Sequence, residues 1–160
     1  MDRDDVFGAI RRERGAVPSL FAEFESYPEG AKAHFDLYRL LILAPGPLPR
    51  AERERILMEA SLANECPYSF RHASQALEFI RETQGETQPS RRQELLSLLA
   101  IHVSKEPRRA SALRPEFDAA GFTPAEWQQA VMIASYANFA NRIAETMDLA
   151  LEEGFEATCH

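Results

Sequence analysis

Apolar residues recur three and four positions apart along most of the chain, which is the spacing of one face of an α-helix. Three such stretches follow one another, at residues 50–63, at 67–81 and from Ser90 to Pro107. No stretch alternates apolar and polar residues with the period of a β-strand, so the sequence predicts an all-α protein. The predicted inward residues of the three helices are Ile56, Leu57, Ala60 and Leu62 or Ala63; Phe70, Ala73, Leu77 and Ile80; and Leu95, Leu96, Leu98, Leu99 and Ile101.

The strongest helix start lies in the last third of the chain. Thr123-Pro124-Ala125-Glu126 combines a capping box with a proline at the first helical position. It predicts a long helix from Pro124 to about Glu152. The inward residues of this helix are predicted to include Trp127, Val131, Ala134, Phe139 and Ile143.

Prolines and glycines predict shorter elements elsewhere. A first helix opens at Asp4-Asp5 and ends at Gly15, a short turn begins at Pro18, and a longer helix begins at Pro28. The proline-rich run at residues 44–49 predicts a rigid connector. Residues 83–89 are predicted to form a loop, and residues 115–120 a short helix that ends at Gly121.

The chain of 160 residues has the length of one domain with a substantial core. We expect N-terminal helices and the connector at 1–49, a core at 50–152, and a tail at 153–160 that is disordered and exposed. Hydrophobic residues make up 45% and charged residues 27%, as in soluble globular proteins. The net charge of −7 gives no support to a nucleic-acid partner.

Membrane and secretory functions are not supported either. The densest apolar run, residues 40–44, is far too short to cross a bilayer, and no secretory leader is visible at the N-terminus. The two cysteines, Cys66 and Cys159, do not make a disulfide framework. We therefore expect a reducing, cytoplasmic setting and no membrane partner.

Candidate chemistry gathers around Cys66. Pro67 follows directly and favours the first position of a helix, which places Cys66 at or just before a helix N-terminus. Unpaired N–H groups and the positive end of the helix dipole lower the pKa of a thiol there. The sequence predicts a reactive cysteine, with an inert, buried core cysteine as the alternative.

Two motifs carry a family resemblance. Glu54 lies twelve positions before Cys66-Pro67-Tyr68-Ser69, and Asn138-Phe139-Ala140-Asn141-Arg142 follows downstream. The pair resembles the alkylhydroperoxidase D-like (AhpD-like) and carboxymuconolactone decarboxylase superfamily. Its peroxidase-related branch carries an acid, eleven residues and Cys-Pro-Tyr-Cys, then Asn-Phe-x-Asn-Arg. The resemblance covers most of the chain and implies an all-α, AhpD-like helical domain that forms a homo-oligomer.

The chain departs from this pattern at two positions. The family's second cysteine, which attacks the peroxide, is Ser69 here, and serine cannot form a disulfide. The family's histidine often lies seven positions after the first cysteine, where this chain has Ala73. His72 is turned about 120° away from Cys66 on a helix but can approach Ser69. The two-cysteine relay implied by the resemblance is therefore not intact.

The remaining candidate residues each have two interpretations. Glu54 belongs either to a solvated charged face or, as the resemblance implies, points inward with a raised pKa as a general acid or base. Tyr68 either packs or donates a proton. Asn138, Asn141 and Arg142 either cap, pair and face a subunit boundary, or shape the pocket. His34 and His102 are interpreted as structural, and no zinc-type spacing or bound cofactor is predicted.

Three functions remain open at this point. The first is a thiol-dependent oxidoreductase or peroxidase of antioxidant type, with Cys66 as nucleophile, Glu54 and His72 moving protons, and an external thiol as reductant. The second is a decarboxylase-like acid–base enzyme that acts on a small carboxylated substrate through Glu54 and His72. The third is a binding homologue without catalysis.

Two further expectations concern Cys159 and self-association. Cys159 is expected in a frayed tail, although it could supply the resolving thiol that Ser69 does not provide. Members of the superfamily commonly self-associate through helical surfaces. Apolar residues of the N-terminal helices are predicted to offer such a surface: Phe7, Leu20, Phe21 and Phe24.

Overall fold

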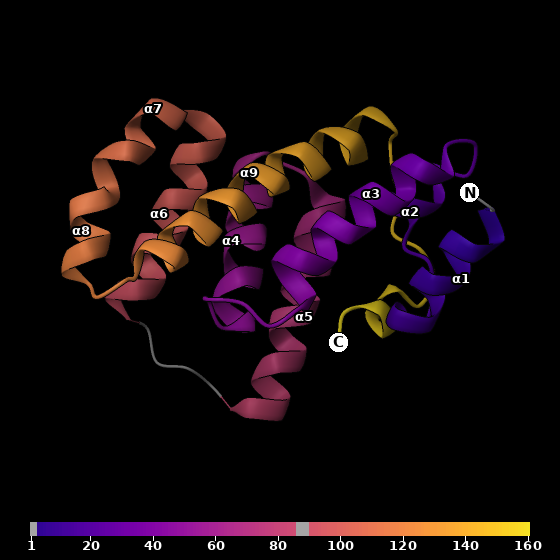
Figure 1. Cartoon of the computed structure of the whole chain (residues 1–160), viewed down its shortest axis with the longest axis horizontal. Coiled ribbons are helices and arrows are strands. Elements are labelled where there is room, and N and C mark those ends of the chain that lie inside the picture. Colours follow the sequence, from indigo (N-terminus) through magenta and orange to yellow (C-terminus); the bar gives the residue numbers. More distant parts are fainter. Residues whose placement is uncertain (1–2, 86–89) are drawn as a thin grey trace.

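The computed structural model describes residues 3–85 and 90–160, and within them it is helical with no β-strand (Figure 1). This confirms the predicted all-α class. The N-terminal part contains α1 (Arg3–Arg14), α2 (Ser19–Ala22), α3 (Pro28–Tyr38) and the π-helical turn η1 (Arg39–Leu43). The rest contains α4 (Arg50–Ala63), α5 (Pro67–Gln84), α6 (Arg91–Lys105), α7 (Pro107–Ala110), the 3₁₀ turn η2 (Ser111–Leu113), α8 (Arg114–Ala119), α9 (Pro124–Thr146) and the 3₁₀ turn η3 (Phe155–Thr158).

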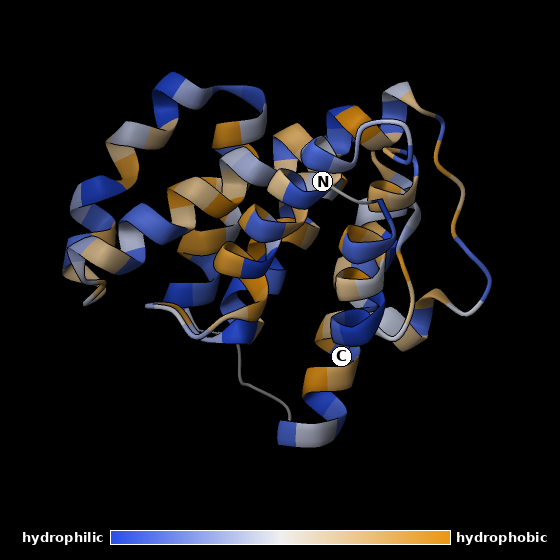
Figure 2. Ribbon diagram, turned by 45° about the vertical axis from the view of Figure 1, so that its right-hand side comes forward, coloured by the Kyte–Doolittle hydropathy of each residue, from blue (hydrophilic) through white to orange (hydrophobic). Residues whose placement is uncertain are grey.

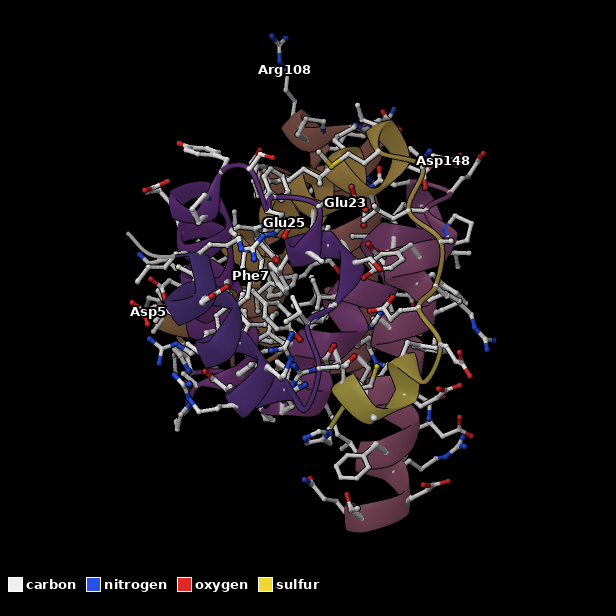
Figure 3. All side chains as sticks on the ribbon, turned by 90° about the vertical axis from the view of Figure 1, so that its right-hand side faces the viewer. Asp5, Phe7, Glu23, Glu25, Arg108 and Asp148 are labelled. Atoms are coloured by element: carbon white, nitrogen blue, oxygen red, sulfur yellow. The ribbon has the colours of Figure 1, made fainter. Side chains whose placement is uncertain are left out.

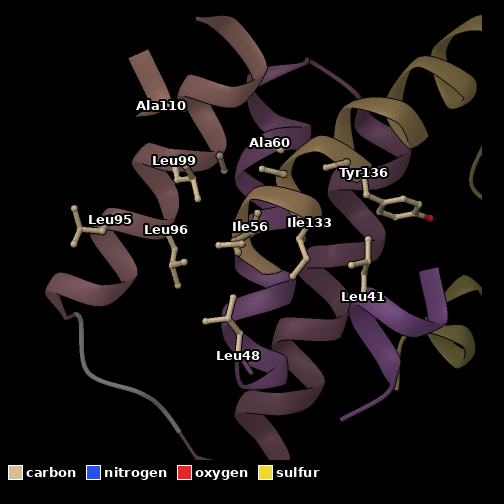
Figure 4. Close-up of a cluster of buried hydrophobic side chains, with 14 of the residues drawn as sticks. Leu41, Leu48, Ile56, Ala60, Leu95, Leu96, Leu99, Ala110, Ile133 and Tyr136 are labelled. Atoms are coloured by element: carbon tan, nitrogen blue, oxygen red, sulfur yellow. The ribbon is translucent and has the colours of Figure 1, made fainter. Parts of the chain in front are cut away.

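The main core forms where α4, α6 and α9 meet. Apolar side chains from these helices and from η1 pack against one another there. Figure 2 shows hydrophobic residues gathered in the middle of the molecule, where the helices meet. Burial of such side chains is the main driving force for folding. Figure 4 shows the central residues of the cluster, among them Leu41, Leu48, Ile56, Ala60, Leu95, Leu96, Leu99, Ile133 and Tyr136.

Most predicted helix starts are confirmed, and the reasons are visible. Thr123 accepts a hydrogen bond from the N–H of Glu126, whose carboxylate accepts one from the N–H of Thr123, so the capping box is complete. Ser90 caps α6 through the N–H of Gln93. The loop predicted at residues 83–89 begins only after Gln84, and its residues 86–89 lie outside the described residues.

The long helix ends earlier than predicted, at Thr146 and not near Glu152. Asp148 has a left-handed conformation with φ of 51°. The N–H of Leu149 bonds to the carbonyl of Ala144 at 3.0 Å, and the N–H of Asp148 to that of Glu145 at 3.3 Å. This pair of bonds is a Schellman motif, which terminates a helix whatever apolar pattern follows.

Three predicted inward residues lie outside the core. Phe139 of α9 is 50% exposed, and Leu98 and Ile101 of α6 are also exposed, although Ala134 is fully buried. At 100° per residue these three side chains point away from the buried face of their helix, so apolar character alone did not reveal which face packs.

The N-terminal helices pack into a cluster of their own. Val6 and Ile10 of α1 meet Phe21 of α2 and Phe35 of α3, with Phe7, Leu20 and Phe24 partly buried beside them. The single chain buries Phe21 but leaves Phe7, Leu20 and Phe24 partly exposed, so the apolar surface predicted from these residues stays a prediction. Self-association itself stays a prediction.

The C-terminal segment, residues 147–160, returns along α5 and ends beside α1 (Figure 3). Figure 3 shows it descending from Asp148 to η3, with α5 alongside. Phe155 and Cys159 are buried against Ala76 of α5. The expectation of a disordered, exposed tail is therefore wrong, because apolar contacts order the segment.

His34 of α3 links the stability of the fold to pH. Its Nε2 lies 2.9 Å from the hydroxyl of Tyr136, and burial lowers the pKa of His34 to about 4. The unfolded chain therefore takes up a proton on this histidine at a higher pH than the folded protein does. The free energy of unfolding consequently falls as the pH drops from about 6.5 towards 4.

We expect His34→Gln to remove this dependence. Between pH 7 and 4.5 the wild-type protein should lose about 2 kcal/mol more free energy of unfolding than the variant. Urea denaturation at the two pH values measures the difference. Equal losses in both proteins would show that His34 does not contribute.

Candidate functional site

The turn between α4 and α5 fixes the position of Cys66. Glu65 adopts a left-handed conformation with φ of 56°. The N–H of Cys66 bonds to the carbonyl of Ser61, and the N–H of Glu65 to that of Leu62, both at 3.0 Å, which is a second Schellman motif. Cys66 is then the N-cap of α5 and Pro67 its first residue, as predicted.

The surroundings of Cys66 are apolar. Its side chain is 1% exposed and packs with Tyr68 and Ala144, and its thiol donates to the Ser69 hydroxyl at 3.5 Å. Burial raises the pKa of the Cys66 thiol. The predicted lowering of this pKa is therefore wrong, since desolvation of the thiolate outweighs the hydrogen bonds at the helix N-terminus.

A cavity of about 70 Å³ lies beside this turn, between α4, α5 and α9 and under the C-terminal segment. It offers room for roughly five water molecules or a small organic group. Its lining residues include Glu54 and Ser61 of α4, Ser69 and His72 of α5, Asn141 of α9, Arg14 and Cys159. Cys66 is not among the lining residues, so the cavity is reached by Ser69 and Cys159 instead.

Glu54 points inward, as the resemblance implied. Its side chain is buried, and the guanidinium of Arg50 donates to it at 2.6 Å. Burial raises the pKa of Glu54, although the positive charge of Arg50 acts against this. The alternative of a solvated helix face is therefore wrong for Glu54.

His72 stands between a thiol and a carboxylate. Its Nδ1 lies 3.5 Å from Sγ of Cys159, and its Nε2 lies 3.5 Å from Oε1 of Glu152. The ring also packs near those of Tyr68 and Phe155, with centroids 4.7 and 5.2 Å away. His72 and Ser69 both line the cavity, but His72 takes its close polar contacts from the C-terminal segment.

Cys159 completes this arrangement from the far end of the chain. It is 3% exposed, and its sulfur also lies 3.4 Å from the carbonyl oxygen of Phe155. Burial raises the pKa of the Cys159 thiol to about 11. The thiol is therefore neutral at physiological pH and needs a base such as His72 to react.

Glu152 holds the C-terminal segment to α2 and α5. Its carboxylate accepts bonds from the N–H of Ser19 at 3.3 Å, the hydroxyl of Ser19 at 3.4 Å and the hydroxyl of Tyr68 at 3.4 Å. Burial opposes ionisation, but His72 and main-chain N–H groups keep the pKa of Glu152 below its usual range. The hydroxyl of Tyr68 also accepts a hydrogen bond from the N–H of Leu20 at 3.1 Å. Tyr68 therefore packs against Cys66 with its ring and forms hydrogen bonds with its hydroxyl.

The three residues of the downstream motif have separate roles. Asn138 bonds to Asn64 and Ser104, and so ties α9 to the end of α4 and to α6. Asn141 is fully buried, accepts from the Ser61 hydroxyl at 3.2 Å and lines the cavity. Arg142 is exposed and does not line it. Only Asn141 therefore shapes the pocket.

The described part of the chain contains no group of three or more His, Cys, Asp or Glu side chains arranged to hold a metal ion. Within the same residues, no helix has both the length and the apolar character needed to span a membrane.

Several solved structures share the fold of this chain. An AhpD-core, peroxidase-related protein from Ralstonia eutropha JMP134 has a TM-score of 0.82 and 23% identity, over 98% of this chain and 90% of that one. A peroxidase-related protein from Silicibacter sp. TM1040 has a TM-score of 0.83 and 18% identity, over 98% and 88%. The apo debrominase Bmp8 has a TM-score of 0.70 and 21% identity, over 98% and 89%.

These similarities confirm the AhpD-like fold that the two motifs suggested. No family model matches the sequence, and a search of curated proteins finds no match either.

The raised pKa of Cys159 predicts how it reacts with an alkylating agent. Iodoacetamide reacts with thiolates, so the rate of Cys159 alkylation should rise about tenfold per pH unit from pH 7 to 9. Quenched samples analysed by peptide mass spectrometry give this rate for Cys159 separately from Cys66. A plateau at or below pH 8 would contradict the raised pKa.

Proposed function

We propose that this AhpD-like chain is a thiol-dependent oxidoreductase of the peroxidase-related type, which reduces a small peroxide in the cavity. Its nucleophile is Cys159, and His72 is the base. The observation that carries the proposal is the 3.5 Å contact between Cys159 Sγ and His72 Nδ1 at the cavity wall. Cys66, the nucleophile predicted from the sequence, is buried and does not line the cavity, whereas Cys159 does.

The arrangement follows the logic of an activated nucleophile. A neutral thiol gains reactivity when an adjacent imidazole takes its proton, and a carboxylate beyond the imidazole orients the ring and stabilises its charged form. Cys159, His72 and Glu152 lie in this order, with 3.5 Å at each contact. The apolar surroundings that raise the pKa of the thiol also exclude water from the reaction.

The proposed cycle balances with an external thiol as reductant. Cys159 sulfur attacks the terminal peroxide oxygen, His72 takes the thiol proton, and the O–O bond breaks. The leaving alkoxide takes a proton from His72 and departs as an alcohol, which leaves a sulfenic acid on the two-electron-oxidised Cys159. One thiol molecule then forms a mixed disulfide and releases water, and a second restores Cys159 and leaves as a disulfide.

Ser69 has no part in closing a disulfide in this cycle. Ser69 lines the cavity, and its hydroxyl accepts a hydrogen bond from the Cys66 thiol at 3.5 Å. Because serine cannot resolve a sulfenic acid, regeneration depends on the external thiol.

One observation favours a second function, an acid–base enzyme that needs no thiol. Glu54 is buried at the cavity and burial raises its pKa, as is common for carboxyl groups that act as general acids or bases. His72 lines the same cavity and would be its partner. This function predicts no dependence on either cysteine.

Turnover of a small hydroperoxide with excess dithiothreitol tests the proposal. Cys159→Ala and His72→Ala should each lower kcat/KM by about 100-fold or more, because each removes a member of the nucleophile–base pair. Cys66→Ala is the matched control and should stay close to wild type. If Cys66→Ala loses activity while Cys159→Ala retains it, the nucleophile is Cys66. If neither cysteine substitution changes turnover, a thiol mechanism is excluded.

A further inference from the structure

Three residues that line the cavity carry a buried nitrogen atom without a hydrogen-bond partner among the described residues. One of these atoms is Nε2 of His72, and the other two are donors on Arg14 and Asn141. Nε of Arg14 and Nδ2 of Asn141 are buried and make no hydrogen bond within the described structure. The two residues are 4% and 0% exposed, and both line the cavity. Buried donors left without an acceptor are costly, so two of them on residues that line one small cavity point to a ligand that brings an oxygen atom.

The two donors lie on different walls of the space that Cys159 reaches. Arg14 ends α1, and its Nη1 donates to the main-chain oxygen of His160 at 2.9 Å, one residue beyond Cys159. Asn141 projects from α9 and is held through its Oδ1 by the Ser61 hydroxyl, which leaves its amide nitrogen free. A thiol, a base and two fixed donors are thus gathered around one cavity.

We propose that the cavity also catalyses acyl transfer from small esters, with Cys159 as nucleophile and with Asn141 Nδ2 and Arg14 Nε as donors to the developing oxyanion. This activity rests on the proposed function only in sharing Cys159 and His72. It differs in that no electron is transferred, so neither an oxidant nor a reductant is needed.

The steps balance as follows for an ester and water. Cys159 sulfur attacks the carbonyl carbon, His72 takes the thiol proton, and the carbonyl oxygen becomes an oxyanion that accepts from the two donors. The carbon–oxygen bond to the leaving alcohol then breaks, and His72 returns the proton to that alcohol. Water attacks the resulting thioester by the same route, which releases the carboxylic acid and restores the thiol.

Electrostatics favour an oxyanion at this place. Glu54, the carboxylate that lines the cavity, takes its ion pair from Arg50 at 2.6 Å, and the charge of Arg14 acts on it only at longer range. Fixed donors in a site shielded from water stabilise developing negative charge strongly, and loss of one such donor lowers the rate by roughly 100-fold to 1,000-fold in enzymes that use them. The cavity volume of about 70 Å³ suits a short acyl group.

The test uses p-nitrophenyl acetate with the whole chain at neutral pH and no added thiol. We expect release of p-nitrophenolate with an acetyl group on Cys159, found by peptide mass spectrometry after an acid quench. Asn141→Leu and Arg14→Gln should each slow acetylation by about tenfold or more. Cys66→Ala, which leaves the cavity lining intact, should acetylate at the wild-type rate.

Alkylation of Cys159 by iodoacetamide is the control for an intact fold, because that reaction forms no oxyanion. Variants that lose acetylation and keep wild-type alkylation support the two donors. Acetylation at the wild-type rate in both Asn141→Leu and Arg14→Gln would overturn the proposal and show ordinary thiol reactivity. An absence of acetylation in a wild-type protein that still turns over peroxide would overturn acyl transfer alone, and an absence of both reactions would overturn Cys159 as nucleophile.

Discussion

The hydrogen bonds that Ser19 and Tyr68 donate to the carboxylate of Glu152 hold the candidate site together. They join α2 and α5 to a segment that would otherwise leave the domain after α9. The same carboxylate lies 3.5 Å from Nε2 of His72, at ion-pair distance but without a hydrogen bond in the described structure, so a single group both fixes the segment and faces the base. Hydrogen bonds to a charged acceptor are about twice as strong as neutral ones, so these bonds stabilise the folded segment more than their number suggests.

The site therefore depends on a segment that has to turn back sharply. Asp148 adopts a left-handed conformation that ends α9, and residues 149–154 then run without helical structure to η3. Phe155 and Cys159 bury against Ala76, and Arg14 bonds to His160. The nucleophile we propose thus lies on a segment that contains no α-helix, and local opening of such a segment requires less free energy than opening of a core helix.

Helix positions were largely readable from the sequence because they depend on local signals. The capping box at Thr123 and the proline after Cys66 each act within one turn of helix, and both helices begin where predicted. The inward direction of Glu54 followed from the resemblance and is confirmed by its burial. The end of α9 was missed because its stop signal is a left-handed aspartate, Asp148, where glycine is the usual residue.

The candidate site was predicted only in part, for a physical reason. Cys159 and His72 are separated by 87 positions, and no local pattern indicates a contact over that distance. Dipole arguments favoured a lowered pKa at Cys66, but the degree of burial, which decides the sign of the shift, is a tertiary property. The orphaned donors of Arg14 and Asn141 likewise become visible only once the cavity is formed.

The central claim is that the thiol of the C-terminal segment, and not the one at the start of α5, meets a peroxide in the cavity. The most direct measurement is to treat the native protein with one equivalent of hydrogen peroxide and to trap sulfenic acid with dimedone. Peptide mass spectrometry then locates the adduct. The account predicts an adduct on Cys159 with Cys66 unmodified, and an adduct that forms first on Cys66 would contradict it.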